Sequence, residues 1–120
     1  RNLASVLLME PRLAASVEVS AFLRRVDSLG GFGTVLQKGD SERGSILLSI
    51  VERGTAVTFL ERMLQPNGLY KWQVSGPDAA DSLALVQYLA RRQRADPDCW
   101  ILELDIPSAE RFIAEMTSEG

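Results

Sequence analysis

The spacing of apolar residues changes at the glycine pair of positions 30–31, and this change predicts a fold of mixed helix and sheet. Before the pair, apolar residues recur three and four positions apart, which predicts one helix over about residues 16–29. The apolar face of that helix comprises Val19, Phe22, Leu23 and Val26. Glycine readily adopts the left-handed conformation that ends a helix, so the pair marks the helix end.

Beyond the glycine pair, short apolar runs alternate with turn residues, as expected of β-strands. Strands are predicted over about 34–37, 46–51, 57–63 and 69–74. The second run is apolar at nearly every position, which predicts a central strand that is covered on both faces. In the fourth run, large residues alternate with Lys71 and Gln73, which predicts a half-solvated strand at a sheet edge. Short loops join the four strands, so we expect an antiparallel meander.

A helix, a strand and a last helix complete the predicted order. Asp78 or Asp81 can cap a helix that runs to about residue 95. Its predicted core face comprises Leu85, Val86, Leu89 and Ala90. A further apolar strand follows over about 100–106, and Pro107 opens the last helix.

The order α-β-β-β-β-α-β-α predicts an α+β domain. We expect a mostly antiparallel five-stranded sheet with three helices that lie mainly on one face. Because the fifth strand follows a helical crossover, it can lie parallel to one of its neighbours.

The absence of histidine narrows the chemistry. Among 120 residues there is no histidine, and Cys99 is the only cysteine. Ser-His-Asp and Cys-His nucleophile pairs and the common zinc sites are therefore excluded. One cysteine closes no internal disulfide, so nothing requires an oxidising compartment and a cytoplasmic location is expected. Cys99 itself is predicted to be a buried small apolar residue.

The charge balance and hydropathy argue against two classes of partner. The formal net charge is −3 and the isoelectric point is near 4.9, so nucleic acid is not an expected partner. No apolar run approaches the roughly 20 residues that cross a bilayer, so no membrane association is expected. We expect a native start at Met9, with residues 1–8 a non-native or disordered extension and residues 9–120 a single domain.

The last predicted strand carries a pair of acids that is a candidate for chemistry. Strand alternation places Glu103 and Asp105 on one face, about 7 Å apart along the strand. Two such carboxylates can share Mg²⁺ or Mn²⁺ in a metal-dependent phosphoester or nucleotide hydrolase. Alternatively, they pair with arginines such as Arg91 or Arg62. No third acid or lysine has a matching spacing, so no catalytic residue, metal site or cofactor is assigned.

Three arginines close the helix that precedes this strand: Arg91, Arg92 and Arg94. Adjacent guanidinium groups can bind phosphates. Together with Arg24 and Arg25 of the first helix, they could bind the backbone of a nucleic acid, as in a nucleic-acid accessory factor. Successive helical residues lie about 100° apart, however, so the three form no single stripe. The alternative interpretation is a solvated helix end.

Tyr70 and Trp72 share one face of the predicted edge strand. Stacked rings can form a ligand platform, whereas in a domain of this size they also serve as core under a helix. An edge strand in addition offers unpaired backbone groups to which a second subunit or an extended peptide can add. These residues therefore favour a partner at a sheet edge.

Several short motifs of the chain resemble a known protein family. The motifs are Val19–Val26, Gly30–Phe32 with Thr34–Leu36, Gly44–Leu48, Glu61-Arg62 before Leu64–Pro66, Tyr88–Arg92, Asp96–Asp98 with Trp100, Glu103–Asp105 and Glu110–Ile113. In these motifs the chain resembles the domain-of-unknown-function family 1491, a family of small alphaproteobacterial proteins. The resemblance covers about residues 9–115 and implies a bacterial, single-domain, cytoplasmic protein. It implies no activity, cofactor or catalytic residue.

The residues together favour a non-catalytic protein-binding or assembly module, with a homodimer as one form of it. The alternatives are the hydrolase that uses Glu103 and Asp105 and the nucleic-acid factor that uses the helical arginines. Converging carboxylates in a cleft would favour the enzyme, and an exposed apolar patch or free sheet edge would favour the binding module. A basic face would favour the nucleic-acid factor.

Overall fold

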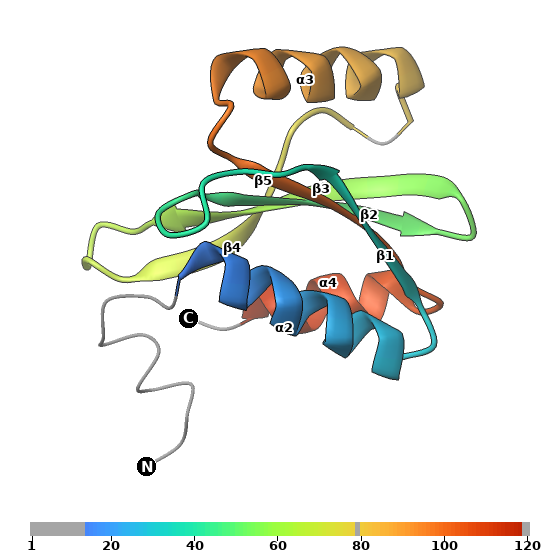
Figure 1. Ribbon diagram of the computed structural model, residues 1–120. Helices are drawn as coiled ribbons and strands as arrows, with labels where there is room; N and C mark the ends of the chain where they lie inside the picture. The colour runs from blue at the N-terminus through green and yellow to red at the C-terminus, as the bar shows by residue number, and fades with distance from the viewer. Residues whose placement is uncertain (1–13, 79, 119–120) are drawn as a thin grey trace.

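The computed structural model describes residues 14–78 and 80–118 of the chain (Figure 1). Met9 and the predicted extension over residues 1–8 lie outside the described residues. In chain order the elements are α2 (Ala15–Ser28), β1 (Phe32–Gln37), β2 (Ile46–Glu52), β3 (Thr55–Leu64), β4 (Tyr70–Ser75), α3 (Ser82–Ala95), β5 (Trp100–Asp105) and α4 (Ala109–Ser118). Within the described residues, this order confirms the predicted α+β arrangement. None of these helices is long and apolar enough to cross a membrane.

The strands form one five-stranded sheet in the order β1-β5-β2-β3-β4. β5 runs parallel to β2, and the other neighbouring pairs are antiparallel, so the mostly antiparallel sheet is confirmed. The predicted meander of four consecutive strands is wrong for its first member, because β5 lies between β1 and β2. β2 and β5 are the two most buried strands, and pairing them at the centre of the sheet removes both from water. α3 supplies the crossover that this parallel pair requires.

A two-residue turn joins β2 to β3. Its residues, Arg53 and Gly54, have positive φ angles of 52° and 80°. Positive φ at both positions matches the twist of the flanking strands, but for Arg53 it is a strained conformation. The turn therefore needs contacts that hold it in place.

The helices divide unequally between the two faces of the sheet. α2 and α4 cover one face, and α3 covers the opposite face (Figure 1). The larger core lies under α2 and α4 and includes Val19, Val26, Leu48, Ile50, Leu60, Leu102, Leu104, Phe112 and Met116. The smaller cluster lies under α3 and comprises Leu47, Phe59, Leu85, Cys99 and Ile101. Two of the described helices thus share one face, as predicted, and the predicted burial of Cys99 is confirmed.

α3 is held at its first turn and along one side. The Asp81 carboxylate accepts a hydrogen bond from the backbone N–H three residues later at 3.0 Å, so of the two predicted N-cap candidates, Asp78 and Asp81, the cap is Asp81. Leu85 is buried against the sheet, and the Tyr88 ring packs on Phe59 with centroids 4.9 Å apart. Val86 is 65% exposed, so its predicted place in the core is wrong. The reason is that Tyr88 faces the sheet together with Leu85 and turns Val86 towards solvent.

Candidate functional site

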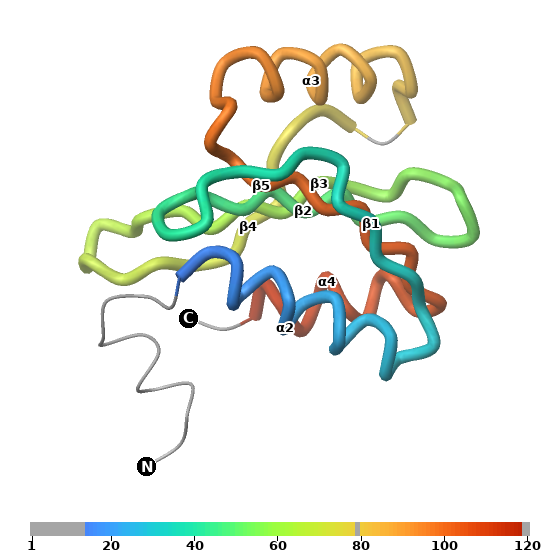
Figure 2. The backbone as a smooth tube through the Cα atoms, in the orientation of Figure 1, coloured from blue at the N-terminus to red at the C-terminus, as the bar shows by residue number. Residues whose placement is uncertain are grey.

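β1 forms one edge of the sheet, and its outer side pairs with no strand among the described residues (Figure 2). On its inner side β1 pairs with β5, and the register shifts between Val35 and Gln37. The strand contains no charged residue and no proline, which are common means of protecting a free edge. Its outer side therefore presents backbone donors and acceptors to another extended segment. We call residues 32–37 with this free side the β1 edge.

Apolar side chains project from both faces of the β1 edge. Phe32 is 71% exposed on the α3 face of the sheet, since it stands opposite Asp105 in the register. Val35 is 40% exposed on the α2 face, since it stands opposite the buried Leu102. Leu36, at the register shift, is 36% exposed. Exposed apolar residues on a strand whose outer side pairs with none of the described residues form a surface suited to association with protein.

β4 forms the other edge of the sheet, which confirms the predicted edge position of this strand. Unlike β1 it includes a charged residue, Lys71, together with Gln73. A lysine on an edge strand disfavours the addition of another strand, because its ammonium group would lose water. Val74, at 56% exposure, is its most exposed apolar residue. The less protected edge is therefore the one at β1.

Asp105, at the end of β5, holds the β2–β3 turn. Its Oδ1 accepts a hydrogen bond from the Arg53 N–H at 2.8 Å, and its Oδ2 accepts one from the Gly54 N–H at 3.0 Å. Both carboxylate oxygens thus bind backbone donors of a turn whose residues have positive φ. Charge-assisted hydrogen bonds of this kind are stronger than neutral ones, so they fix the turn against the central strands.

Glu103 lies two residues before Asp105 on the same face of β5, as the alternation predicts. It stands opposite Thr34 of β1 and beside Ser49 of β2, and its side chain is partly buried. Arg62, one of the arginines expected near these acids, instead forms an ion pair with Glu18 at 2.8 Å. Across residues 14–78 and 80–118, no group of three or more acidic or cysteine side chains is placed to hold a metal ion.

The three arginines near the end of α3 have different surroundings. Arg92 extends to β3, where its Nη1 donates hydrogen bonds to Glu61 at 2.9 Å and to the Tyr88 hydroxyl at 2.8 Å. The hydrogen bond with Glu61 raises the pKa of Arg92 above its usual range. Arg91 and Arg94 are exposed to solvent. The three guanidinium groups therefore do not cluster in the fold.

The two aromatic residues of β4 are also placed differently. Trp72 packs into the core, where its ring meets Phe22 edge-on with centroids 5.5 Å apart. The Arg62 guanidinium lies 5.2 Å from the Trp72 ring centroid, which adds a cation–π contact. Tyr70 is 42% exposed. Trp72 thus contributes to the contact between the sheet and α2, whereas Tyr70 lies near solvent.

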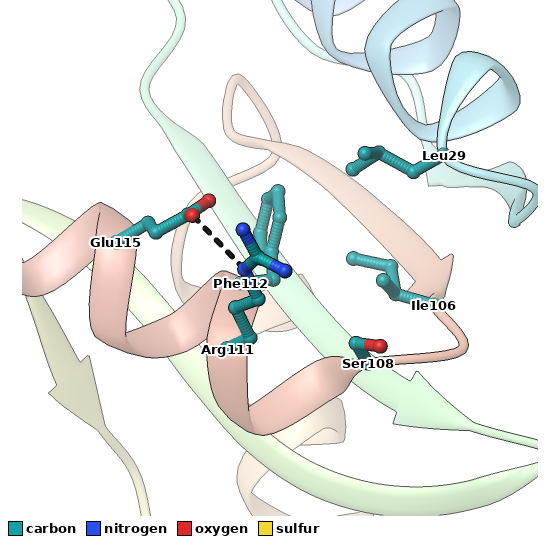
Figure 3. A pocket seen from close by; sticks show the side chains of 6 residues that line it. All are labelled: Leu29, Ile106, Ser108, Arg111, Phe112 and Glu115. Atoms are coloured by element: carbon teal, nitrogen blue, oxygen red, sulfur yellow. Dashed lines mark hydrogen bonds and ion pairs between the residues drawn. The ribbon is translucent and has the colours of Figure 1, made fainter.

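A pocket of about 220 Å³ lies between the end of α2 and α4 (Figure 3). It is lined by Leu29, Ile106, Ser108, Arg111, Phe112 and Glu115. Arg111 Nε lies 3.3 Å from Glu115 Oε2, so the cation and the anion of the pocket compensate each other. Ligand sites usually enclose about 300–1,000 Å³, so this pocket is smaller than a typical ligand site. We assign it no ligand.

The β1 edge is the surface that the sequence interpretation missed. Its signal was present, because Phe32–Gln37 contains no charged residue. The residue pattern predicts an edge for partners only at the fourth strand, residues 69–74. The missing information was the place of β5, which leaves β1 with a neighbour on one side only among residues 14–78 and 80–118.

Comparison with known proteins adds a family and a shared fold. The family described as "Protein of unknown function (DUF1491)" matches residues 13–114 of the chain. No curated protein matches the chain. The crystal structure of a DUF1491 family protein from Caulobacter crescentus CB15 is 30% identical with a TM-score of 0.71, covering 79% of this chain and 89% of that one.

Two structures solved in other ways or from another organism are also similar. The NMR structure of a DUF1491 family protein from Caulobacter crescentus CB15 is 31% identical with a TM-score of 0.68, covering 81% of this chain and 88% of that one. The solution structure of protein Atu0922 from A. tumefaciens is 24% identical with a TM-score of 0.64, covering 79% and 86%. At that identity, Atu0922 supports the fold alone.

Proposed function

The chain belongs to the DUF1491 family, and we propose that it acts as a non-catalytic module that binds a protein partner by strand addition at the β1 edge. The observation that carries the proposal is the outer side of β1, which pairs with no strand in the described part of the chain and is flanked by the exposed Phe32, Val35 and Leu36. A partner strand would satisfy the open backbone groups of β1 and bury these side chains. Both effects favour association.

The surroundings of β1 support this function. β1 is paired with β5, which is buried on both faces at the centre of the sheet. β1 is therefore already ordered before a partner strand binds, so the protein itself loses little conformational entropy on binding. Extended peptides with apolar residues at consecutive positions match such an edge, because consecutive side chains reach opposite faces of the sheet and Phe32 and Val35 lie on opposite faces.

The proposal assigns no chemical step to Glu103 and Asp105. Both oxygens of Asp105 accept backbone hydrogen bonds from the β2–β3 turn, and metal binding there would compete with those bonds. We propose a bacterial cytoplasmic setting for the function. Its support is the bacterial source of the two Caulobacter crescentus structures and the free, buried thiol of Cys99, which requires no oxidising compartment.

A selection experiment tests the function. A random peptide library displayed on phage is selected on the intact chain, and the enriched peptides are then measured on the Val35→Lys variant. The matched control is Val74→Lys, which adds the same charge to an exposed valine on the opposite edge strand. Enriched peptides should bind the original chain and Val74→Lys equally, and Val35→Lys at least about tenfold more weakly, because the new ammonium group loses water on binding.

Hydrogen exchange locates the binding surface. A bound peptide should slow the exchange of outward-facing β1 amides and leave those of β4 unchanged. Far-UV circular dichroism shows whether each variant keeps its fold. The function is wrong if no peptide is enriched and the chain does not self-associate, or if enriched peptides bind Val35→Lys as tightly as the original chain.

A further inference from the structure

We infer that α3 is a lid, which opens from the sheet as a unit while the rest of the fold stays closed. Opening uncovers a second apolar surface, which comprises Leu47, Phe59, Cys99 and Ile101. This surface lies on the face of the sheet opposite α2 and α4 (Figure 1). The inference therefore goes beyond the proposed function, which uses the outer side of β1.

α3 is attached by less apolar burial than the other two described helices. Of its 14 residues, all within the described part of the chain, only Leu85 is buried. α2 buries three residues within the same length, and α4 buries three within ten. Leu83 and Val86 of α3 are 66% and 65% exposed, so two large apolar side chains of this helix remain in water. Because burial of an apolar face is what mainly holds a helix on a sheet, α3 is the most weakly held of these helices.

The α3 backbone also lies farther from the sheet than the α2 backbone does (Figure 2). α2 approaches closely at Gly33, where an added Cβ would lie 2.6 Å from Leu23 Cδ2. α3 instead reaches the sheet through long side chains such as Tyr88, whose ring packs on Phe59. Fewer close contacts are therefore lost when α3 separates from the sheet than when α2 does.

The sheet keeps its support when α3 leaves it. β5, which follows α3 in the chain, pairs with β1 on one side and with β2 on the other. The larger core under α2 and α4 includes no α3 residue among the described ones. Opening therefore breaks the contacts of the smaller cluster, and it leaves the strand pairing and the larger core intact.

The two ends of α3 are suited to a change in its direction. Gly76, between β4 and α3, has a φ angle of 81°, and glycine adopts positive and negative φ about equally well. At the other end the C-cap, Asp96, has a φ of −142° and a ψ of 85°, which is not a helical conformation. Pro97 follows and cannot continue the helix. α3 can therefore turn away from the sheet while both of its ends stay attached.

Polar contacts hold the closed lid at its rim. The Tyr88 hydroxyl donates a hydrogen bond to Ser75 Oγ at 3.1 Å, and Arg92 Nη1 donates one to Glu61 at 2.9 Å. Water replaces these partners when α3 opens, so the contacts oppose opening by much less than their strength in isolation. The main cost of opening is therefore the exposure of the apolar cluster.

Labelling of Cys99 with maleimide tests the lid, because its thiol is fully buried in the closed protein. Leu85→Ala removes apolar burial that exists only while α3 is closed, so it should raise the labelling rate at least about tenfold. The matched control is Met116→Ala, which truncates a side chain of α4 that is 8% exposed in the larger core. This variant destabilises the closed and the opened form equally, so its labelling rate should stay within about twofold of the original.

The comparison between the two variants separates lid opening from global unfolding. Equal acceleration by Leu85→Ala and Met116→Ala would show that Cys99 reacts only when the whole chain unfolds. No acceleration by Leu85→Ala would show that α3 does not control access to the thiol. Either result overturns the lid, and circular dichroism under the labelling conditions shows that both variants are folded.

Hydrogen exchange of the original chain tests the lid without any variant. An isolated helix of 14 residues is marginal in water, so α3 amides should exchange once α3 has left the sheet. They should exchange at least about tenfold faster than the slowest amides of β2 and β5, and low urea should accelerate them less, because opening exposes less surface than global unfolding does. The same urea dependence in α3 and in the central strands would overturn the lid. None of these measurements involves the β1 edge, so the proposed function is tested separately.

Discussion

Asp105 Oδ1 accepts a hydrogen bond from the Arg53 N–H at 2.8 Å across 52 positions of sequence. The contact joins the end of β5 to the β2–β3 turn, in which Arg53 has a φ angle of 52°. A non-glycine residue in this conformation is strained, so it persists only where neighbouring contacts hold it. One of the two acids considered as metal ligands therefore has a structural role in this fold.

Asp105→Asn should lower the free energy of unfolding by about 1–2 kcal/mol. Asparagine keeps one acceptor oxygen, but its amide group would face a second backbone N–H and lose that bond. The matched control is Glu103→Gln on the same strand face, which should change stability by less than about 0.5 kcal/mol. Urea unfolding followed by circular dichroism measures both variants, and equal losses would contradict the role assigned to Asp105.

Arg92→Ala should lower the free energy of unfolding by about 1–3 kcal/mol. The Arg92 and Glu61 side chains are each 21% exposed, so the substitution leaves Glu61 partly buried without its cation. Arg91→Ala removes the exposed neighbouring arginine and should cost less than about 0.5 kcal/mol. Thermal and urea unfolding of the two variants provide the comparison. Similar losses would show that Arg92 does not anchor α3 to β3.

Asp40 should titrate at lower pH than an ordinary aspartate. Its Oδ1 accepts hydrogen bonds from the backbone N–H groups of Arg43 at 2.7 Å and Glu42 at 2.9 Å, which lower the pKa of Asp40 from its ordinary value. Because the folded pKa is the lower one, the contribution to stability is complete above the unfolded pKa. It is lost as the pH falls through the folded pKa.

The stability difference between the original chain and Asp40→Asn should therefore be constant near neutral pH and shrink below about pH 4. Urea unfolding at a series of pH values measures this difference. Carboxyl-carbon NMR titration gives the pKa of Asp40 directly. A difference that grows on acidification would contradict the assigned hydrogen bonds.

Cys99 should react slowly with maleimide in the folded protein. The thiol is fully buried between the sheet and α3, and burial raises its pKa, so the reactive thiolate is scarce at neutral pH. We expect modification at least about 100-fold slower than in urea, because reaction requires local or global opening. Lys71→Cys supplies an exposed thiol for comparison, and its thiol should react at once while Cys99 remains protected. Comparable rates at the two sites would show that α3 does not cover this part of the sheet.

Local patterns predicted much of this fold. The period of apolar residues located α2 and α4, and the alternation in β5 placed Glu103 and Asp105 on one face. The Asp81 cap and the edge position of β4 also followed from residues within a few positions of each other. These features depend on backbone geometry and on neighbours along the chain, so a single sequence contains the information.

Tertiary structure decided the partners of each element. The insertion of β5 between β1 and β2 created the free β1 edge, and the position of α3 on the opposite face turned Tyr88 inward and Val86 outward. Glu61 pairs with Arg92, which is 31 positions away, although other arginines lie nearer in sequence. Such choices depend on how much surface the whole arrangement buries, and many local pairings have nearly equal free energy before the chain closes. Sequence by itself determined which segments are helix and strand, and the collective burial of the core determined which of them meet.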